Sequence, residues 1–132
     1  MNVALGIGCD RGTPAETIAQ AVDEALARAG VTHADVVAVA SVDLKADEGG
    51  LLAFAARRGW TVQFHPAARL AQVPVPNPSE TVRRHIGTPS VSEAAALLAA
   101  SAPMSALLVE KQKSRGGDGR HATVSVARCE PS

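Results

Sequence analysis

The chain has 132 residues, of which 46% are hydrophobic, 20% charged and 2% aromatic. This length suits a single domain spanning residues 1–132, and the apolar fraction excludes a wholly disordered chain. Thirteen basic and thirteen acidic residues cancel, and with so few aromatic rings a nucleic-acid partner is not expected. No apolar run reaches the length of a membrane span, and the first residues lack the basic flank of a secretory signal. No membrane association is therefore expected, and a cytoplasmic location is the default.

The first half of the chain alternates predicted strands and helices. The apolar run 3–8 predicts a strand, and Thr13-Pro14-Ala15-Glu16 has the pattern of a capping box that starts a helix ending at Gly30. The β-branched run 36–42 predicts a strand covered on both faces. A helix over 51–57, closed by Gly59, and a short strand over 61–64 complete this half. This order indicates an α/β fold.

The second half is less regular. We expect a short helix over 66–71, an extended proline-rich stretch over 73–78, and helices over 77–86 and 91–100. Strands over 106–109 and 122–127, joined by a polar loop with three glycines, predict a hairpin. The fold class is therefore α/β: one domain with a mixed, mostly parallel sheet of about five strands, flanking helices and a C-terminal hairpin. Because 26 residues are alanine, the helices must approach the sheet closely.

The first candidate site is the loop after the first strand. Its small or basic residues and the helix that follows would attract a carboxylate or phosphate through backbone amides and a guanidinium. The candidate substrate-binding residues here are Gly8, Arg11, Gly12 and Thr13. The alternative is a simple tight turn. The glycine spacing is one residue too long for the dinucleotide fingerprint. A nucleotide- or phosphate-binding module is therefore a less favoured function for this chain.

The second candidate site is the loop after the strand over 36–42. Asp43, Asp47 and Glu48 could supply a general base, and Lys45 could stabilise an oxyanion. Charged loops are also common on solvated surfaces. The position of the loop favours a functional site, because a strand covered on both faces would place these groups at the edge of the sheet, where α/β proteins bind ligands.

Two further features are candidates. The basic segment 110–121, with Lys111 and Lys113, could be a mobile loop that binds a polycarboxylate or an ordinary hairpin tip. Cys9 precedes a helix start and Arg11, which could lower its thiol pKa and make it a nucleophile, although cysteine is also a common core residue. The histidines show no metal-ligand spacing, so neither a metal nor a cofactor is expected.

Five segments, in this order, carry a family resemblance. They are Gly6–Thr13, Ser41–Glu48, Val75–Ser79, Val91–Leu97 and Ala122–Arg128. Together they resemble the family formed by the cobalamin-biosynthesis protein CobE and the carboxy-terminal domain of CbiG, with the length of stand-alone CobE. Asp10 departs from the basic residue expected before Arg11. The resemblance adds Asn77 and Ser79 as candidate substrate-binding residues.

The resemblance implies a role in building the corrin ring. It favours binding of a corrinoid or precorrin intermediate, whose carboxylate rim suits basic loops, and contact with other cobalamin-biosynthesis enzymes. The alternative is a hydrolase, because CbiG-type proteins open a δ-lactone of a ring-contracted intermediate and release acetaldehyde. In that case an acidic residue of 43–48 would activate water. The step, the preferred intermediate and the oligomeric state do not follow from the sequence.

Overall fold

A computed structural model describes residues 1–76 and 91–129. The strands are β1 (Val3–Cys9), β2 (Val36–Val42), β3 (Val62–His65), β4 (Leu107–Arg115) and β5 (His121–Arg128). The helices are α1 (Ala15–Ala29), α2 (Gly49–Arg58), α3 (Ala67–Leu70) and α5 (Val91–Ala100), with single 3-10 turns η1 (His33–Asp35), η2 (Asp43–Lys45) and η3 (Met104–Ala106).

The strands form one sheet in the order β3-β2-β1-β5-β4. β1 pairs in parallel with β2, and β2 with β3, whereas β5 is antiparallel to both β1 and β4. Four strands therefore run in one direction and β5 alone runs against them. This confirms the predicted α/β class, with its mixed, mostly parallel sheet and C-terminal hairpin.

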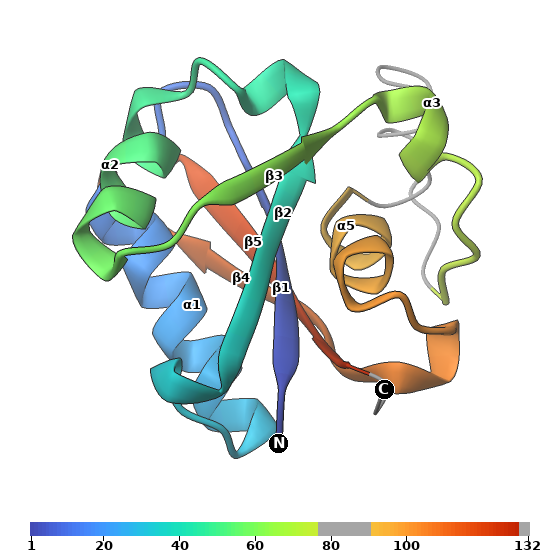
Figure 1. The fold of residues 1–132 in the computed structure, drawn as a ribbon. Coiled ribbons are helices and arrows are strands. Elements are labelled where there is room, and N and C mark those ends of the chain that lie inside the picture. Colours follow the sequence, from blue (N-terminus) through green and yellow to red (C-terminus); the bar gives the residue numbers. More distant parts are fainter. Residues whose placement is uncertain (77–90, 130–132) are drawn as a thin grey trace.

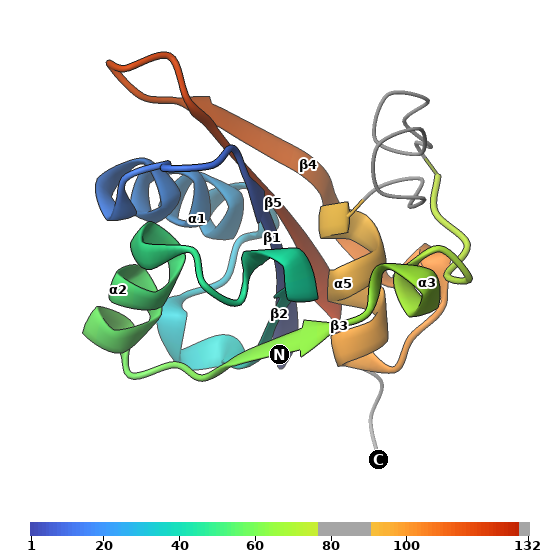
Figure 2. The same ribbon diagram turned by 90° about the horizontal axis from the view of Figure 1, so that it is seen from above.

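Helices cover both faces of the sheet (Figures 1 and 2). The helices α1 and α2 lie on one face, and α3 and α5 lie on the other. The largest core cluster fills the first face, where alternate residues of β1 such as Leu5 and Ile7 meet Ile18 and Phe54. The other face is packed mainly with small residues, including Ala4, Ala40 and the alanines of α5.

The approach of α5 to the sheet is unusually close at Gly6. A Cβ atom added to Gly6 would lie 1.8 Å from the carbonyl oxygen of Ser92 and 2.6 Å from the amide nitrogen of Ala96. Only a residue without a side chain fits there, because real Cβ atoms do not come so near to backbone atoms. The expectation that an alanine-rich core brings helix and sheet together is confirmed at this contact.

Most predicted elements agree with the structure to within one or two residues, and the C-terminal hairpin differs most. β4 continues to Arg115, so residues 110–115 form a strand and not the predicted loop, and the connecting loop is limited to 116–120. β2 has its last four residues buried, as predicted, but Val37 near its start is exposed. The predicted helix over 77–86 lies outside the described residues.

The predicted capping box at Thr13 is wrong. Pro14 is the N-cap of α1, and the hydroxyl of Thr13 donates instead to the carbonyl of Asp10 at 2.7 Å. The stop signals are confirmed, since Gly30 and Gly59 end α1 and α2 in the left-handed conformation that glycine favours.

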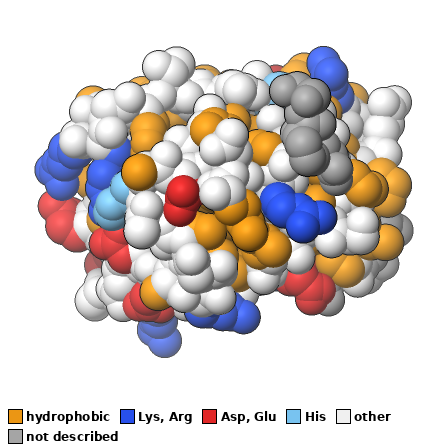
Figure 3. Space-filling view, turned by 60° about the horizontal axis from the view of Figure 1, so that its bottom comes forward, with side chains coloured by type: hydrophobic (Ala, Val, Ile, Leu, Met, Phe, Trp, Pro, Cys, Tyr) orange, Lys and Arg blue, Asp and Glu red, His pale blue; other side chains and the backbone are white. Residues whose placement is uncertain are grey.

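The two ends of the described chain meet at the amino-terminal edge of β1, where the Cys129 amide donates to the Asn2 carbonyl at 2.9 Å. Exposed apolar side chains belong to segments at this edge, notably Met1, Val37, Met104 and Leu108. Figure 3 turns this end forward and shows hydrophobic side chains gathered between charged ones. Among the described residues, no helix is both long and apolar enough to cross a membrane.

Candidate functional site

The opposite, carboxyl-terminal edge of the sheet brings three loops together. We call this set the rim: residues 10–14 after β1, 43–48 after β2, and 116–120 between β4 and β5. β1 and β2 are parallel neighbours, so the loops that follow them leave the same edge of the sheet, and the antiparallel hairpin returns there beside β1. Two of the loops predicted as sites, far apart in sequence, therefore adjoin.

Arg11 is the link between the first two loops. Its Nη1 atom donates to Asp47 Oδ1 at 2.8 Å and to Glu48 Oε2 at 3.0 Å, and the Gly12 amide donates to Glu48 Oε1 at 2.8 Å. Glu48 is nearly buried, with 5% of its side chain exposed, whereas 77% of the Asp47 side chain is exposed. The predicted anion-binding loop thus already holds a carboxylate, and that carboxylate is the protein's own Glu48.

These contacts also fix the charge of Asp47. The hydrogen bond from Arg11, followed by the Coulombic attraction of its guanidinium, holds the pKa of the Asp47 carboxyl below its usual range. A carboxylate held in its charged form is a weak proton acceptor. The geometry of Asp47 and Glu48 therefore suits them to binding Arg11 better than to activating water.

The hairpin fastens the first loop from its other side. Arg120 Nε donates to the Arg11 carbonyl at 2.8 Å and its Nη1 pairs with Asp118 at 3.0 Å. The His121 amide donates to Asp10 Oδ2 at 2.8 Å, and this bond is the main cause that lowers the pKa of Asp10. Asp10, which departs from the family pattern, therefore has a structural partner in the hairpin.

The sequence reasoning missed the part that Arg120 plays. Its side chain holds the loop that carries Arg11, although it lies 109 positions further along the chain. The available signal was weak: a basic residue just before a predicted strand that returns to β1. Only the pairing of β5 with β1 brings the two residues together.

Two candidates, one in the first loop and one at the end of β1, pack toward the interior of the protein. Thr13 is 1% exposed, and its hydroxyl lies within hydrogen-bonding distance of the Asp10 and His121 carbonyls. Cys9 packs against the main core beside α1. Burial raises the pKa of the Cys9 thiol to about 11, although Lys45 and Arg11 act in the opposite direction. The expected lowering of this pKa is wrong, because desolvation outweighs the nearby positive charges.

Lys45 is the half-buried cation of the rim. Its charge acts on Cys9, Asp10 and Asp47, which places the ammonium group amid the first two loops. Within 1–76 and 91–129, its side chain forms no hydrogen bond or ion pair. Asp43 precedes it in η2 and is exposed to solvent, so both side chains are within reach of a molecule bound at the rim.

The remaining candidates lie on the α5 side of the sheet. A Cβ on Gly8 would face Val91 of α5, and the pairing of β1, β5 and β4 aligns Gly8 with Thr123 and Lys113 on that face. The Lys111 Nζ atom is 3.7 Å from Oε1 of the fully buried Glu93. Lys111 and Lys113 therefore belong to a strand beside α5. Asn77 and Ser79 lie outside the described residues.

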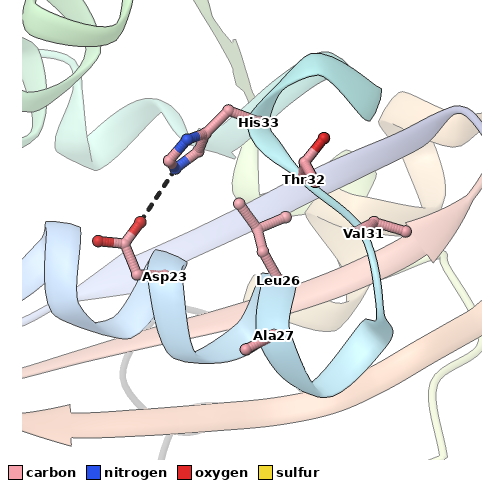
Figure 4. Close-up of a pocket in the computed structure, with 6 residues that line it drawn as sticks. All are labelled: Asp23, Leu26, Ala27, Val31, Thr32 and His33. Atoms are coloured by element: carbon pink, nitrogen blue, oxygen red, sulfur yellow. Dashed lines mark hydrogen bonds and ion pairs between the residues drawn. The ribbon is translucent and has the colours of Figure 1, made fainter.

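A separate hollow of about 320 Å³ lies near the end of α1 (Figure 4). Leu26, Ala27 and Val31 contribute apolar surface, and Asp23 and His33 face each other at 3.0 Å. It contains none of the predicted site residues. In the described part of the chain, no three His, Cys, Asp or Glu side chains form a group that could hold a metal ion.

The family is decided by comparison with known proteins. Residues 3–127 match the family model described as "Cobalamin synthesis G C-terminus". The chain belongs to this family. It is a cobalamin-biosynthesis protein of the CobE/CbiG type, as the five sequence segments indicated.

Two relatives of this CobE/CbiG-type protein differ in length. Protein CobE of a Sinorhizobium species is 39% identical over 127 residues, which cover 95% of the chain and 79% of that protein. The cobalt-precorrin-5A hydrolase of Priestia megaterium is 34% identical over 125 residues. That match covers 95% of the chain but 32% of the hydrolase, so the chain spans about a third of that relative.

The fold also matches a solved structure. The crystal structure of CobE, described as a protein from the cobalamin (vitamin B12) biosynthetic pathway, superposes with a TM-score of 0.76 at 31% identity. The match covers 99% of this chain and 92% of that one. The sheet and helices of the CobE/CbiG-type protein are therefore those of CobE over nearly the whole chain.

Proposed function

We propose that this CobE/CbiG-type protein binds a corrinoid or precorrin intermediate at the rim. The observation that carries the proposal is the position of Arg11 and Lys45 at the ends of adjacent parallel strands. Corrin precursors carry acetate and propionate groups around an apolar ring. Guanidinium and ammonium groups at the edge of a sheet suit such carboxylates.

The scarcity of aromatic residues shapes how the ring would be held. Phe54 is buried in the core, and Trp60 and Phe64 pack against the same cluster, so none of the three offers a stacking platform at the rim. Leu44, in η2 between Asp43 and Lys45, is 53% exposed and gives an aliphatic surface there. Binding would combine apolar contact with the ring face and charged contact with its edge.

A visible-absorbance titration of the full chain with hydrogenobyrinic acid tests this proposal. Binding shifts the corrin spectrum, and Arg11→Ala or Lys45→Ala weakens the affinity by about three- to tenfold. Arg57→Ala is the matched control, because Arg57 and Arg11 are both 63% exposed and both pair with an acidic side chain. Absence of a spectral change at high micromolar ligand, with normal cobalamin production in a deletion strain, would refute the function.

The alternative function is hydrolysis of a lactone in the macrocycle. It is favoured by the placement of Asp43 and Lys45 in one exposed turn, and by the relative named cobalt-precorrin-5A hydrolase. Asp43 would take a proton from water, the resulting hydroxide would add to the lactone carbonyl, and the ring C–O bond would break to give a carboxylate and an alcohol. Lys45 would stabilise the oxyanion formed in between.

Mass analysis of the intermediate separates hydrolysis from binding. Turnover adds the mass of one water or removes a two-carbon unit, and Asp43→Asn then abolishes the change without loss of folding. An unchanged mass with a clear spectral shift leaves binding alone. A thermal-shift screen with nucleotides covers the weaker nucleotide-binding alternative, for which a rise in melting temperature would be required.

A further inference from the structure

Arg11 has two carboxylate partners that differ sharply in their surroundings. The same nitrogen, Nη1, contacts both Asp47 at 2.8 Å and Glu48 at 3.0 Å. Asp47 is largely exposed and Glu48 is nearly buried. An exposed ion pair contributes little to stability, whereas a buried carboxylate without its donors is costly.

Glu48 is held by more than the guanidinium. Its other oxygen accepts the Gly12 amide, its own amide donates to the Lys45 carbonyl, and its carbonyl accepts the Leu52 amide at the start of α2. If Glu48 lost its contact with Arg11, its carboxylate would stay buried without the charged partner. In the described part of the chain, Arg11 is the one side chain that hydrogen-bonds the Asp47 carboxylate, so no other side-chain hydrogen bond is lost when that contact opens.

The guanidinium has capacity for another carboxylate. In the described ranges, all its hydrogen bonds are made through Nη1, so the donors on Nε and Nη2 are unused. Guanidinium groups bind carboxylates best through two parallel hydrogen bonds. The Arg11 side chain is also 63% exposed, so such a group has access from solvent.

We propose that Asp47 occupies the place of a ligand carboxylate on Arg11, and that the ligand displaces Asp47 while Glu48 stays in contact with the arginine. The inference rests on the proposed function, since a corrin bearing several carboxylates supplies the competing group. Asp47 is tethered beside Arg11, so its effective concentration is in the millimolar range or above. A lone carboxylate such as acetate competes poorly, whereas a ligand anchored by further contacts, including Lys45, succeeds. The site thereby selects polycarboxylates.

Titration of the wild-type chain and four variants with hydrogenobyrinic acid tests the displacement. Asp47→Asn removes the competing charge and keeps the side-chain size, so it binds about two- to fivefold more tightly than the wild type. Glu16→Gln is the matched control: Glu16 is 75% exposed, lies in the first turn of α1 and pairs with Arg57 at 3.5 Å. It removes the same charge near the rim without touching Arg11. In an Arg11→Ala background, Asp47→Asn gives no gain.

The outcomes separate this inference from the proposed function. Wild-type binding with equal affinities for Asp47→Asn and Glu16→Gln overturns the displacement and leaves corrinoid binding intact. If the Asp47→Asn variant binds and the wild type does not, the displacement is supported, because the contact between Asp47 and Arg11 then blocks the ligand in the wild type. Absence of binding by all chains overturns both. Tight binding of millimolar acetate by the wild type, measured by its competition with the corrinoid, also contradicts the proposed selection.

Discussion

Replacing Gly6 by alanine tests the close contact between β1 and α5. The added Cβ would lie 1.8 Å from the Ser92 carbonyl oxygen and 2.6 Å from the Ala96 amide nitrogen. Both are backbone atoms of α5, so no side-chain rotation relieves the clash. The helix as a whole must withdraw by about 1 Å or more, which opens the small-residue packing on that face.

The expected cost is at the upper end of the range for overpacking. Forcing an extra methyl group into a packed interior costs about 1–3 kcal/mol, and more when backbone must move. We expect Gly6→Ala to lower the free energy of unfolding by about 3 kcal/mol or more, which corresponds to a fall in Tm of about 10 °C. Gly8→Ala is the matched control on the same strand and face, since the nearest atom to its Cβ would be 3.9 Å away, on Val91.

Urea unfolding followed by far-ultraviolet circular dichroism measures both variants. Gly8→Ala should be neutral or more stable by up to about 1 kcal/mol, because alanine restricts the unfolded chain. If Gly6→Ala unfolds within about 0.5 kcal/mol of Gly8→Ala, the contact between strand and helix is not as close as described, and the reasoning is refuted.

Three further predictions concern the rim and the end of β1 beside it. Glu48→Gln lowers the free energy of unfolding by about 1–3 kcal/mol, whereas Asp47→Asn changes it by less than about 0.5 kcal/mol, as measured by thermal denaturation. In a Cys129→Ser background, Cys9 reacts negligibly with iodoacetamide at pH 7 and rapidly only near pH 11, where its thiol ionises; fast alkylation at neutral pH contradicts the burial. The lowered pKa of Asp10 stabilises the fold above the pKa of an unfolded aspartate, and this contribution is lost as pH falls through the folded value. Asp10→Asn therefore shows a smaller fall in urea midpoint between pH 6 and 2 than the wild type, and an equal fall would refute the bond to the hairpin.

The elements that could be predicted are those whose signals are local. The β-branched run of β2 and the glycines after α1 and α2 each fix structure through their own backbone preferences. The polar half of β4 gave no such signal. Its Gln112 and Ser114 face polar side chains of α1, notably Glu24 at 2.7 Å and 3.3 Å. A strand covered by polar partners lacks the apolar alternation by which strands are predicted.

The location of the rim could be predicted from the sequence, but the side-chain contacts within it could not. Loops after parallel strands share an edge, which brought Arg11 and Lys45 together. The pairing of Arg11 with Glu48 spans 37 positions and depends on side-chain directions, so the sequence showed Glu48 only as one charge among several. Thr13 was misread for a related reason. Its hydroxyl donates to the Asp10 carbonyl, whereas in a capping box the hydroxyl oxygen accepts a hydrogen bond from a helix amide.

The hydrogen bond between Asn2 and Cys129 determines where a polypeptide attached to this domain leaves the fold. A polypeptide joined before β1 or after β5 departs from the edge of the sheet that lies opposite Arg11 and Lys45. A fused neighbour, an affinity tag or a sensor surface attached at either terminus thus leaves the loops of the rim directed away from the attachment. The region that matches this chain makes up about a third of the longer hydrolase and most of protein CobE.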